Sequence, residues 1–142
     1  MKTTHQGSCL CGEIRYEING TIDGILNCHC SDCRKSHGAA FRTRGAVNPD
    51  DFVFLSGGHL LTRYAHKPDE FRCFCSRCGS NVVTMYTDPT TPLGLALGTL
   101  DTELTSGPKC HVFTSDKASW HTITDTLTQY AHLPPSSSSE IM

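Results

Sequence analysis

The sequence contains two cysteine-rich stretches, Cys9-Leu10-Cys11-Gly12 and Cys75-Ser76-Arg77-Cys78-Gly79, that lie far apart along the chain. C-x-C and C-x-x-C are spacings at which one short turn presents two sulfurs to a single ion. The glycine after each pair lets the backbone fold tightly around the sulfurs. Because a structural zinc ion takes four thiolate or imidazole ligands, the two stretches together predict one closed zinc site. This site would join segments more than sixty residues apart and stabilise a small β domain.

A third cluster, Cys28-His29-Cys30-Ser31-Asp32-Cys33, contains three cysteines and not four. Its sulfurs are predicted to bind one face of a second zinc ion, which leaves the fourth ligand open. One interpretation is a saturated structural site whose fourth ligand is His37, Cys73, Cys110 or His111. The other is an open site that a water, a substrate or a small thiol reaches.

The charge of this second site favours thiol capture over water activation. Zinc with three thiolates has a formal charge of about −1, against +2 for a three-histidine site, and is therefore a weaker Lewis acid. Coordination removes the proton of an incoming thiol and holds its sulfur as a thiolate. Arg34 and Lys35 follow the cluster directly. We expect them to offset the negative charge and bind a carboxylate of the incoming molecule.

Cysteine usage and charge limit the compartment and the partners. The chain has nine cysteines, and an odd number argues against a fully paired disulfide framework. The amino-terminal residues show no signal-peptide pattern, so we expect a reducing cytoplasmic location in which clustered thiols bind metal. A formal net charge of −2 gives no general attraction to nucleic acid or to an anionic membrane. We therefore expect neither as a partner.

Hydrophobic periodicity predicts an all-β fold in one domain. Ile14, Tyr16 and Ile18 alternate with polar residues in a strand that ends at Asn19-Gly20. Further strands are predicted over residues 52–55, 60–64, 71–74, 81–86, 93–97 and 110–114. One short helical segment is predicted from Cys33 to His37, capped by Ser31 or Asp32 and ended by Gly38. Residues 133–142 have the composition of a flexible tail.

Several residues outside the clusters also allow predictions. Cys73 alternates with Phe71 on a predicted strand, which favours a buried thiol. Trp120 is expected to pack in the core, with an apolar wall beside Lys117 and Phe113 as the alternative. The candidates for a general base are His29, His37 and His111.

Several ordered motifs resemble one known family. They are the run from Gly7 to Gly12 leading into Ile14-Arg15-Tyr16, the run from Cys28 to Lys35, the run from Phe74 to Ser80, and His111-Val112-Phe113 with the segment from Lys117 to Trp120. Together they resemble the glutathione-dependent formaldehyde-activating enzymes and centromere protein V, over residues 5 to 132.

This resemblance implies a β-tent fold with two zinc ions. It assigns Cys9, Cys11, Cys75 and Cys78 to a structural zinc, and Cys28, Cys30 and Cys33 to a catalytic zinc. The implied reaction is condensation of formaldehyde with glutathione to S-hydroxymethylglutathione, which is a carbon–sulfur lyase step in reverse. The expected partner is a small thiol or its adduct, and the resemblance allows a homodimer.

Three alternatives stay open. The protein can be a noncatalytic binding module in which both zinc ions are structural. Association with chromatin, as for centromere protein V, needs a basic surface that the composition does not provide. Methionine sulfoxide reduction on a related β-tent fold needs a catalytic motif, and the thiols of Cys73 and Cys110 do not supply one.

Overall fold

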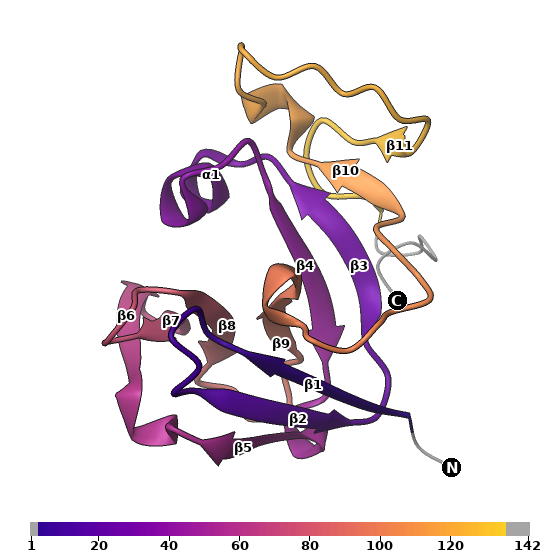
Figure 1. Ribbon diagram of the computed structural model, residues 1–142. Coiled ribbons are helices and arrows are strands. Elements are labelled where there is room, and N and C mark those ends of the chain that lie inside the picture. The colour runs from indigo at the N-terminus through magenta and orange to yellow at the C-terminus, as the bar shows by residue number, and fades with distance from the viewer. Residues whose placement is uncertain (1–2, 136–142) are drawn as a thin grey trace. The chain divides into compact units, whose positions relative to one another are not determined.

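A computed structural model describes residues 3–135, and the predicted all-β class is confirmed (Figure 1). The chain divides into two compact units. We call Met1–Ile22 with Gly45–Thr105 the first unit, and Asp23–Arg44 with Ser106–Met142 the second unit. No helix of the described part of the chain is long and apolar enough to cross a membrane. The predicted zinc domain over residues 5–132 stays a prediction, and most of the predicted tail, from residue 136 onward, lies outside the described residues.

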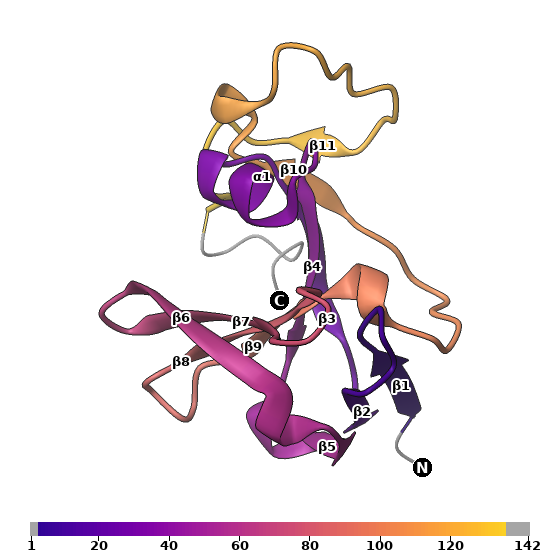
Figure 2. The same ribbon diagram turned by 60° about the vertical axis from the view of Figure 1, so that its left-hand side comes forward.

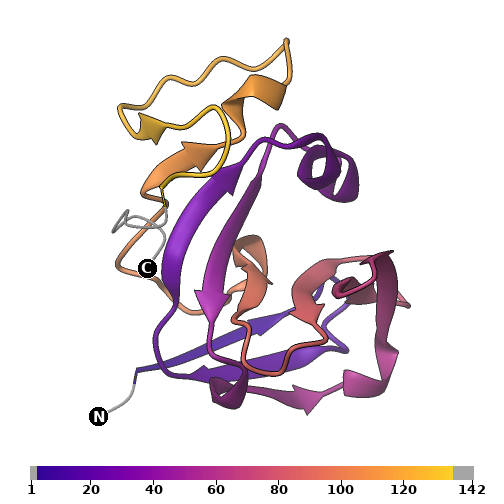
Figure 3. The same ribbon diagram turned by 180° about the vertical axis from the view of Figure 1, so that it is seen from behind.

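Three strands of the first unit form an antiparallel sheet in the order β1-β2-β5 (Figure 3). They are β1 (Thr4–Ser8), β2 (Arg15–Asn19) and β5 (Phe52–Ser56). The alternation predicted for β2 is confirmed, since Tyr16 and Ile18 are fully buried. The Tyr16 hydroxyl pairs with Thr99 Oγ1 at 2.7 Å, which satisfies the polar end of a buried ring.

The other strands of the first unit form an antiparallel ladder in the order β9-β8-β7-β6. Their bounds are β6 (Leu61–Lys67), β7 (Glu70–Cys75), β8 (Asn81–Tyr86) and β9 (Leu93–Ala96). Short 3-10 helices are η1 (Pro49–Asp51), η2 (Gly58–Leu60) and η3 (Leu97–Thr99). Cys73 lies on β7 with 1% of its surface exposed, so its prediction as a buried thiol is confirmed.

The second unit holds a parallel arrangement in the order β11-β10-β3 (Figure 2). Its elements are β3 (Asp23–Cys28), α1 (Ser31–His37), β10 (Cys110–Val112), η4 (Thr114–Asp116) and β11 (Thr128–Gln129). Strand β4 (Arg42–Val47) begins in this unit and ends in the first. The middle cysteine cluster therefore lies where β3 ends and α1 begins.

Helix α1 forms where the sequence predicts it, but its cap is a different residue. Neither Ser31 nor Asp32 is the N-cap. The N-cap residue is Cys30, whose Sγ accepts a hydrogen bond from the backbone N–H of Cys33 at 3.3 Å. The helix ends at Gly38, whose φ of 58° is left-handed and therefore suits glycine. The cap ties the middle cysteine of the cluster to the last one.

Candidate metal centres

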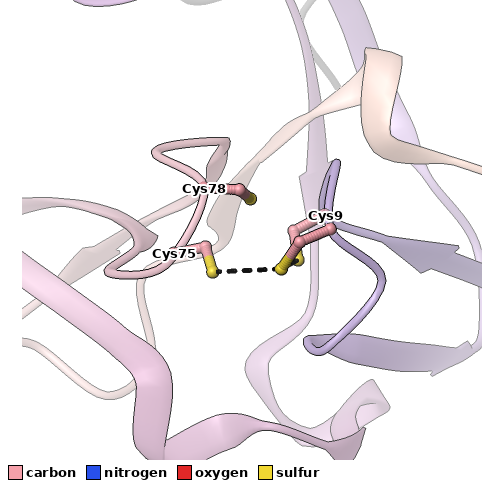
Figure 4. Close-up of side chains that lie close together, drawn as sticks. Cys9, Cys75 and Cys78 are labelled. Atoms are coloured by element: carbon pink, nitrogen blue, oxygen red, sulfur yellow. Dashed lines mark hydrogen bonds between the residues drawn. The ribbon is translucent and has the colours of Figure 1, made fainter.

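The first unit brings the four sulfurs of Cys9, Cys11, Cys75 and Cys78 to within 4.8 Å of one another. Cys9 Sγ lies 3.5 Å from Cys11 Sγ, and Cys11 Sγ lies 3.9 Å from Cys75 Sγ. Figure 4 shows Cys9, Cys75 and Cys78 pointing toward a common centre from two segments of the chain. The structure thus assembles, from residues distant in sequence, the set that the spacings predict. We call it the closed cluster.

Two tight turns present these sulfurs. Gly12 and Gly79 have φ values of 80° and 79°, which are left-handed conformations that favour glycine. The N–H of Gly12 donates to the carbonyl of Cys9 at 3.0 Å, and the N–H of Gly79 donates to that of Cys75 at 2.8 Å. The backbone N–H of Ile14 also donates to Cys9 Sγ at 3.3 Å. The predicted role of both glycines is confirmed.

The closed cluster fits zinc. With zinc–sulfur bonds of about 2.3 Å, a tetrahedral site places its sulfurs roughly 3.8 Å apart, close to the two distances above. The Ser80 hydroxyl is the main cause that lowers the pKa of Cys78, to about 5. A backbone hydrogen bond from Glu13 lowers the pKa of Cys11, but desolvation and the adjoining sulfurs outweigh it and raise that pKa to about 12. Four closely spaced thiols cannot all ionise without mutual repulsion, and a divalent cation bound between them would offset this repulsion.

The second unit brings Cys28, Cys30 and Cys33 together with their sulfurs within 4.8 Å of one another. We call this set the open cluster. Among the described residues, no histidine, aspartate, glutamate or further cysteine joins the group. The fourth ligands considered from the sequence, which are His37, Cys73, Cys110 and His111, do not form part of this group, and the identity of the fourth ligand stays a prediction. Three soft donors on one face suit zinc with one coordination position left over.

Neighbouring sulfurs also disfavour ionisation of the thiols in the open cluster. The neighbouring thiols of Cys30 and Cys33, together with burial, raise the pKa of Cys28. The hydrogen bond with the thiol of Cys28 lowers the pKa of Cys30. The thiol of Cys33 and desolvation outweigh this effect, so the pKa of Cys30 is raised as well. A cation held by the three sulfurs offsets this repulsion.

The basic residues predicted to accompany the open cluster lie on α1. Arg34 is half-buried, and its Nε donates to the carbonyl of Asp116 at 3.2 Å. Lys35 is exposed. The contact of Arg34 links the helix to η4 within the second unit, and recognition of a carboxylate by either residue stays a prediction.

One ring nitrogen of His29 is paired with a second histidine. Its Nε2 lies 2.8 Å from Nδ1 of His111, and its backbone N–H donates to the carbonyl of Val112 at 3.0 Å. His111 Nε2 in turn lies 3.0 Å from Oδ2 of Asp125. Burial, followed by the charges of His111, His121 and Lys117, lowers the pKa of His29 to about 4.

The segment after η4 corrects one prediction. Trp120 is not a core residue, because 72% of its surface is exposed. The ammonium of Lys117 donates to the backbone carbonyls of Ala118 and His121 and so holds this loop together. Lys117 directly follows η4, and its polar contacts, not burial of the tryptophan, connect the residues of this loop.

Comparison with known proteins identifies the family. A family model described as glutathione-dependent formaldehyde-activating enzyme matches residues 4–116, which include both cysteine clusters. The chain belongs to this family. A crystal structure of a protein from Rhodobacter sphaeroides is similar to this member of the family, with a TM-score of 0.57 and 22% sequence identity over 70% of this chain and 91% of that chain. At that identity the likeness shows the fold.

Sequence reasoning missed three side chains beside the histidine pair. The rings of Phe41 and His121 lie 5.0 Å and 6.1 Å from the ring of His29, measured between centroids, and Asp125 pairs with His111. None belongs to a spacing motif, and Asp125 lies in a threonine-rich segment beyond the residues that the family model matches. The pairing between β3 and β10 brings these segments together, and no local signal encodes that pairing.

Proposed function

We propose that this protein binds a small thiol such as glutathione at the open cluster and forms or cleaves the adduct of that thiol with an aldehyde. The observation that carries the proposal is the difference in ligand number between the two clusters. Four sulfurs converge in one and three in the other, and no fourth His, Cys, Asp or Glu ligand atom of the described residues groups with the three. Family membership supports the same chemistry. The proposed activity is that of a carbon–sulfur lyase of the S-hydroxymethylglutathione type.

The residues of this chain would have the following roles in the proposed reaction. The sulfurs of Cys28, Cys30 and Cys33 would hold zinc, and a bound zinc ion would supply a centre that keeps the incoming thiol ionised. Arg34 and Lys35, directly after the last cysteine, would bind a carboxylate of that molecule. The closed cluster would hold a structural zinc.

The reaction balances without an external oxidant or reductant. The thiolate sulfur of the bound molecule attacks the aldehyde carbon, so a carbon–sulfur bond forms while the carbonyl π bond breaks. The electron pair of that bond moves to oxygen, which takes a proton and becomes the hydroxyl of the adduct. Cleavage follows the same path in reverse.

Calorimetric titration of the fully zinc-loaded protein with glutathione tests the proposal. We expect binding by the parent protein and none by Cys30→Ser, while Cys73→Ala binds as the parent does because Cys73 lies outside both clusters. Equal binding by the parent and Cys30→Ser would show that the thiol binds elsewhere. A parent protein that does not bind glutathione, together with a saturated second metal, would support the module with two structural zinc ions.

A further inference from the structure

A buried chain of hydrogen bonds starts at the open cluster and ends at the surface of the second unit. It runs from His29 through His111 to Asp125, with distances of 2.8 Å between the two imidazoles and 3.0 Å to the carboxylate. His29 is fully buried and His111 is 2% exposed, whereas the side chain of Asp125 is 47% exposed. The N–H of Leu127 donates to Asp125 Oδ1 at 3.0 Å and fixes the carboxylate from its other side.

The order of the groups fixes where the hydrogens lie. An ionised carboxylate only accepts, so His111 Nε2 must carry the hydrogen that faces Asp125. A neutral imidazole carries its hydrogen on one ring nitrogen and keeps the other as a bare acceptor, and the 2.8 Å contact between the two rings needs one donor and one acceptor. Nδ1 of His111 therefore accepts from Nε2–H of His29. It follows that Nδ1 of His29 carries no hydrogen and keeps its lone pair.

That last nitrogen is an unusual group for a protein interior. Nδ1 of His29 is buried and has no hydrogen-bond partner among the residues that the structure describes. Buried acceptors are normally satisfied, and leaving one unsatisfied costs about 1–3 kcal/mol. Two half-buried rings, Phe41 and His121, flank His29.

We propose that Asp125 and His111 are positioning residues that hold His29 in the tautomer whose Nδ1 accepts a hydrogen bond from the hydroxyl of the thiol–aldehyde adduct. The inference rests on the proposed function, which supplies the adduct. His29 stands between Cys28 and Cys30 in the chain, and its Nδ1 is the ring nitrogen that does not face His111. The bare nitrogen distinguishes ligands, since the adduct offers a hydroxyl donor and a free aldehyde offers only an acceptor.

The tautomers can be read directly. Long-range correlation of ring hydrogens with nitrogen-15 in the zinc-loaded, labelled protein distinguishes a protonated from a bare imidazole nitrogen. We expect Nε2 to be protonated in both His29 and His111, with Nδ1 of His29 bare and free of hydrogen bonds. Addition of glutathione with formaldehyde should then shift the Nδ1 resonance of His29, and glutathione alone should not. A protonated Nδ1, or one already hydrogen-bonded before ligand is added, would overturn the inference.

A substitution at the far end of the chain separates positioning from folding. Asp125→Asn keeps the size of a half-exposed side chain but removes the charge that selects the His111 tautomer. We expect the rate of adduct formation to fall about tenfold, the equivalent of one lost hydrogen bond, with zinc content and glutathione affinity unchanged. Asp125→Glu should recover part of the rate, and the matched control Asp50→Asn, which removes an exposed carboxylate of the first unit, should not alter it.

The outcomes separate this inference from the proposed function. If glutathione binds and the adduct forms but Asp125→Asn behaves as the parent, the positioning role is wrong and the proposed function stands. If glutathione does not bind the parent, the calorimetric titration reports that failure by itself. The inference then falls with it, whatever tautomers the histidines adopt.

Discussion

The closed and open clusters use the same ligand atom in opposite ways. The closed cluster joins Cys11 to Cys75 across a sequence separation of 64, within the first unit. The open cluster takes three sulfurs from six consecutive residues at the end of β3 and the start of α1, within the second unit. A metal that closes a long loop contributes free energy of folding, because the unfolded chain cannot form its site. A metal held by one short segment constrains little of the chain and is available for chemistry.

Removal of one ligand from each cluster should produce the largest measurable difference between the two clusters. In Cys75→Ser we expect loss of one zinc ion and a fall in the free energy of unfolding on the order of 4 kcal/mol, because Cys75 is fully buried and links two distant segments. Cys30→Ser should also lose one zinc ion but only about 1 kcal/mol, since Cys30 is half-buried and caps a seven-residue helix.

Zinc content by atomic absorption and denaturant unfolding of both variants check these values. Cys73→Ala serves as the control for replacing a buried cysteine of the first unit outside either cluster. Equal destabilisation by Cys75→Ser and Cys30→Ser would show that both metals are structural.

A smaller effect is expected at the turn that presents Cys78. Gly79→Ala places a Cβ on a residue with φ of 79°, where no atom lies within 4 Å of it. The cost is therefore backbone strain alone, about 1–2 kcal/mol, and it should appear as a lower melting temperature and weaker zinc retention against a chelator. Gly98→Ala, which also meets no atom within 4 Å but has no left-handed φ, is the matched control. A Gly79→Ala protein as stable as the control would show that the turn at Gly79 does not require glycine.

The smallest effect concerns recognition at the open cluster. Arg34→Ala should weaken glutathione binding about threefold to tenfold through the loss of one charged hydrogen bond, with both zinc ions retained. Titration calorimetry measures the affinity, and Lys67→Ala on β6 controls for the loss of one exposed positive charge. Unchanged affinity in Arg34→Ala would assign its guanidinium to the contact with Asp116 alone.

The sequence predicted both clusters because metal ligation is encoded locally. C-x-C and C-x-x-C pairs are set by turn geometry, and the glycines after them mark the turns. Strands such as β2 and β7 were also predictable, since one of their faces is buried and residues alternate. The cap of α1 was not predicted correctly, because a sulfur from the cluster replaces the usual hydroxyl or carboxylate.

Elements defined by distant partners escaped prediction. Strand β1 is polar and pairs with β2 through its backbone, and β3 ends in four consecutive buried residues with no alternation. Strand β11 has two residues and exists only beside β10. The contact between His111 and Asp125 depends on the fold of an irregular segment, so no pattern in the sequence indicates it.

Cadmium-113 NMR of the protein with both sites loaded measures the ligand number of each cluster, because the chemical shift of cadmium depends on how many thiolates bind it. We expect two resonances for the parent protein, one typical of four sulfurs and one of three. Addition of glutathione should move the second resonance into the four-sulfur range and leave the first unchanged. Two four-sulfur resonances that do not respond to glutathione would show instead that both clusters are saturated structural sites.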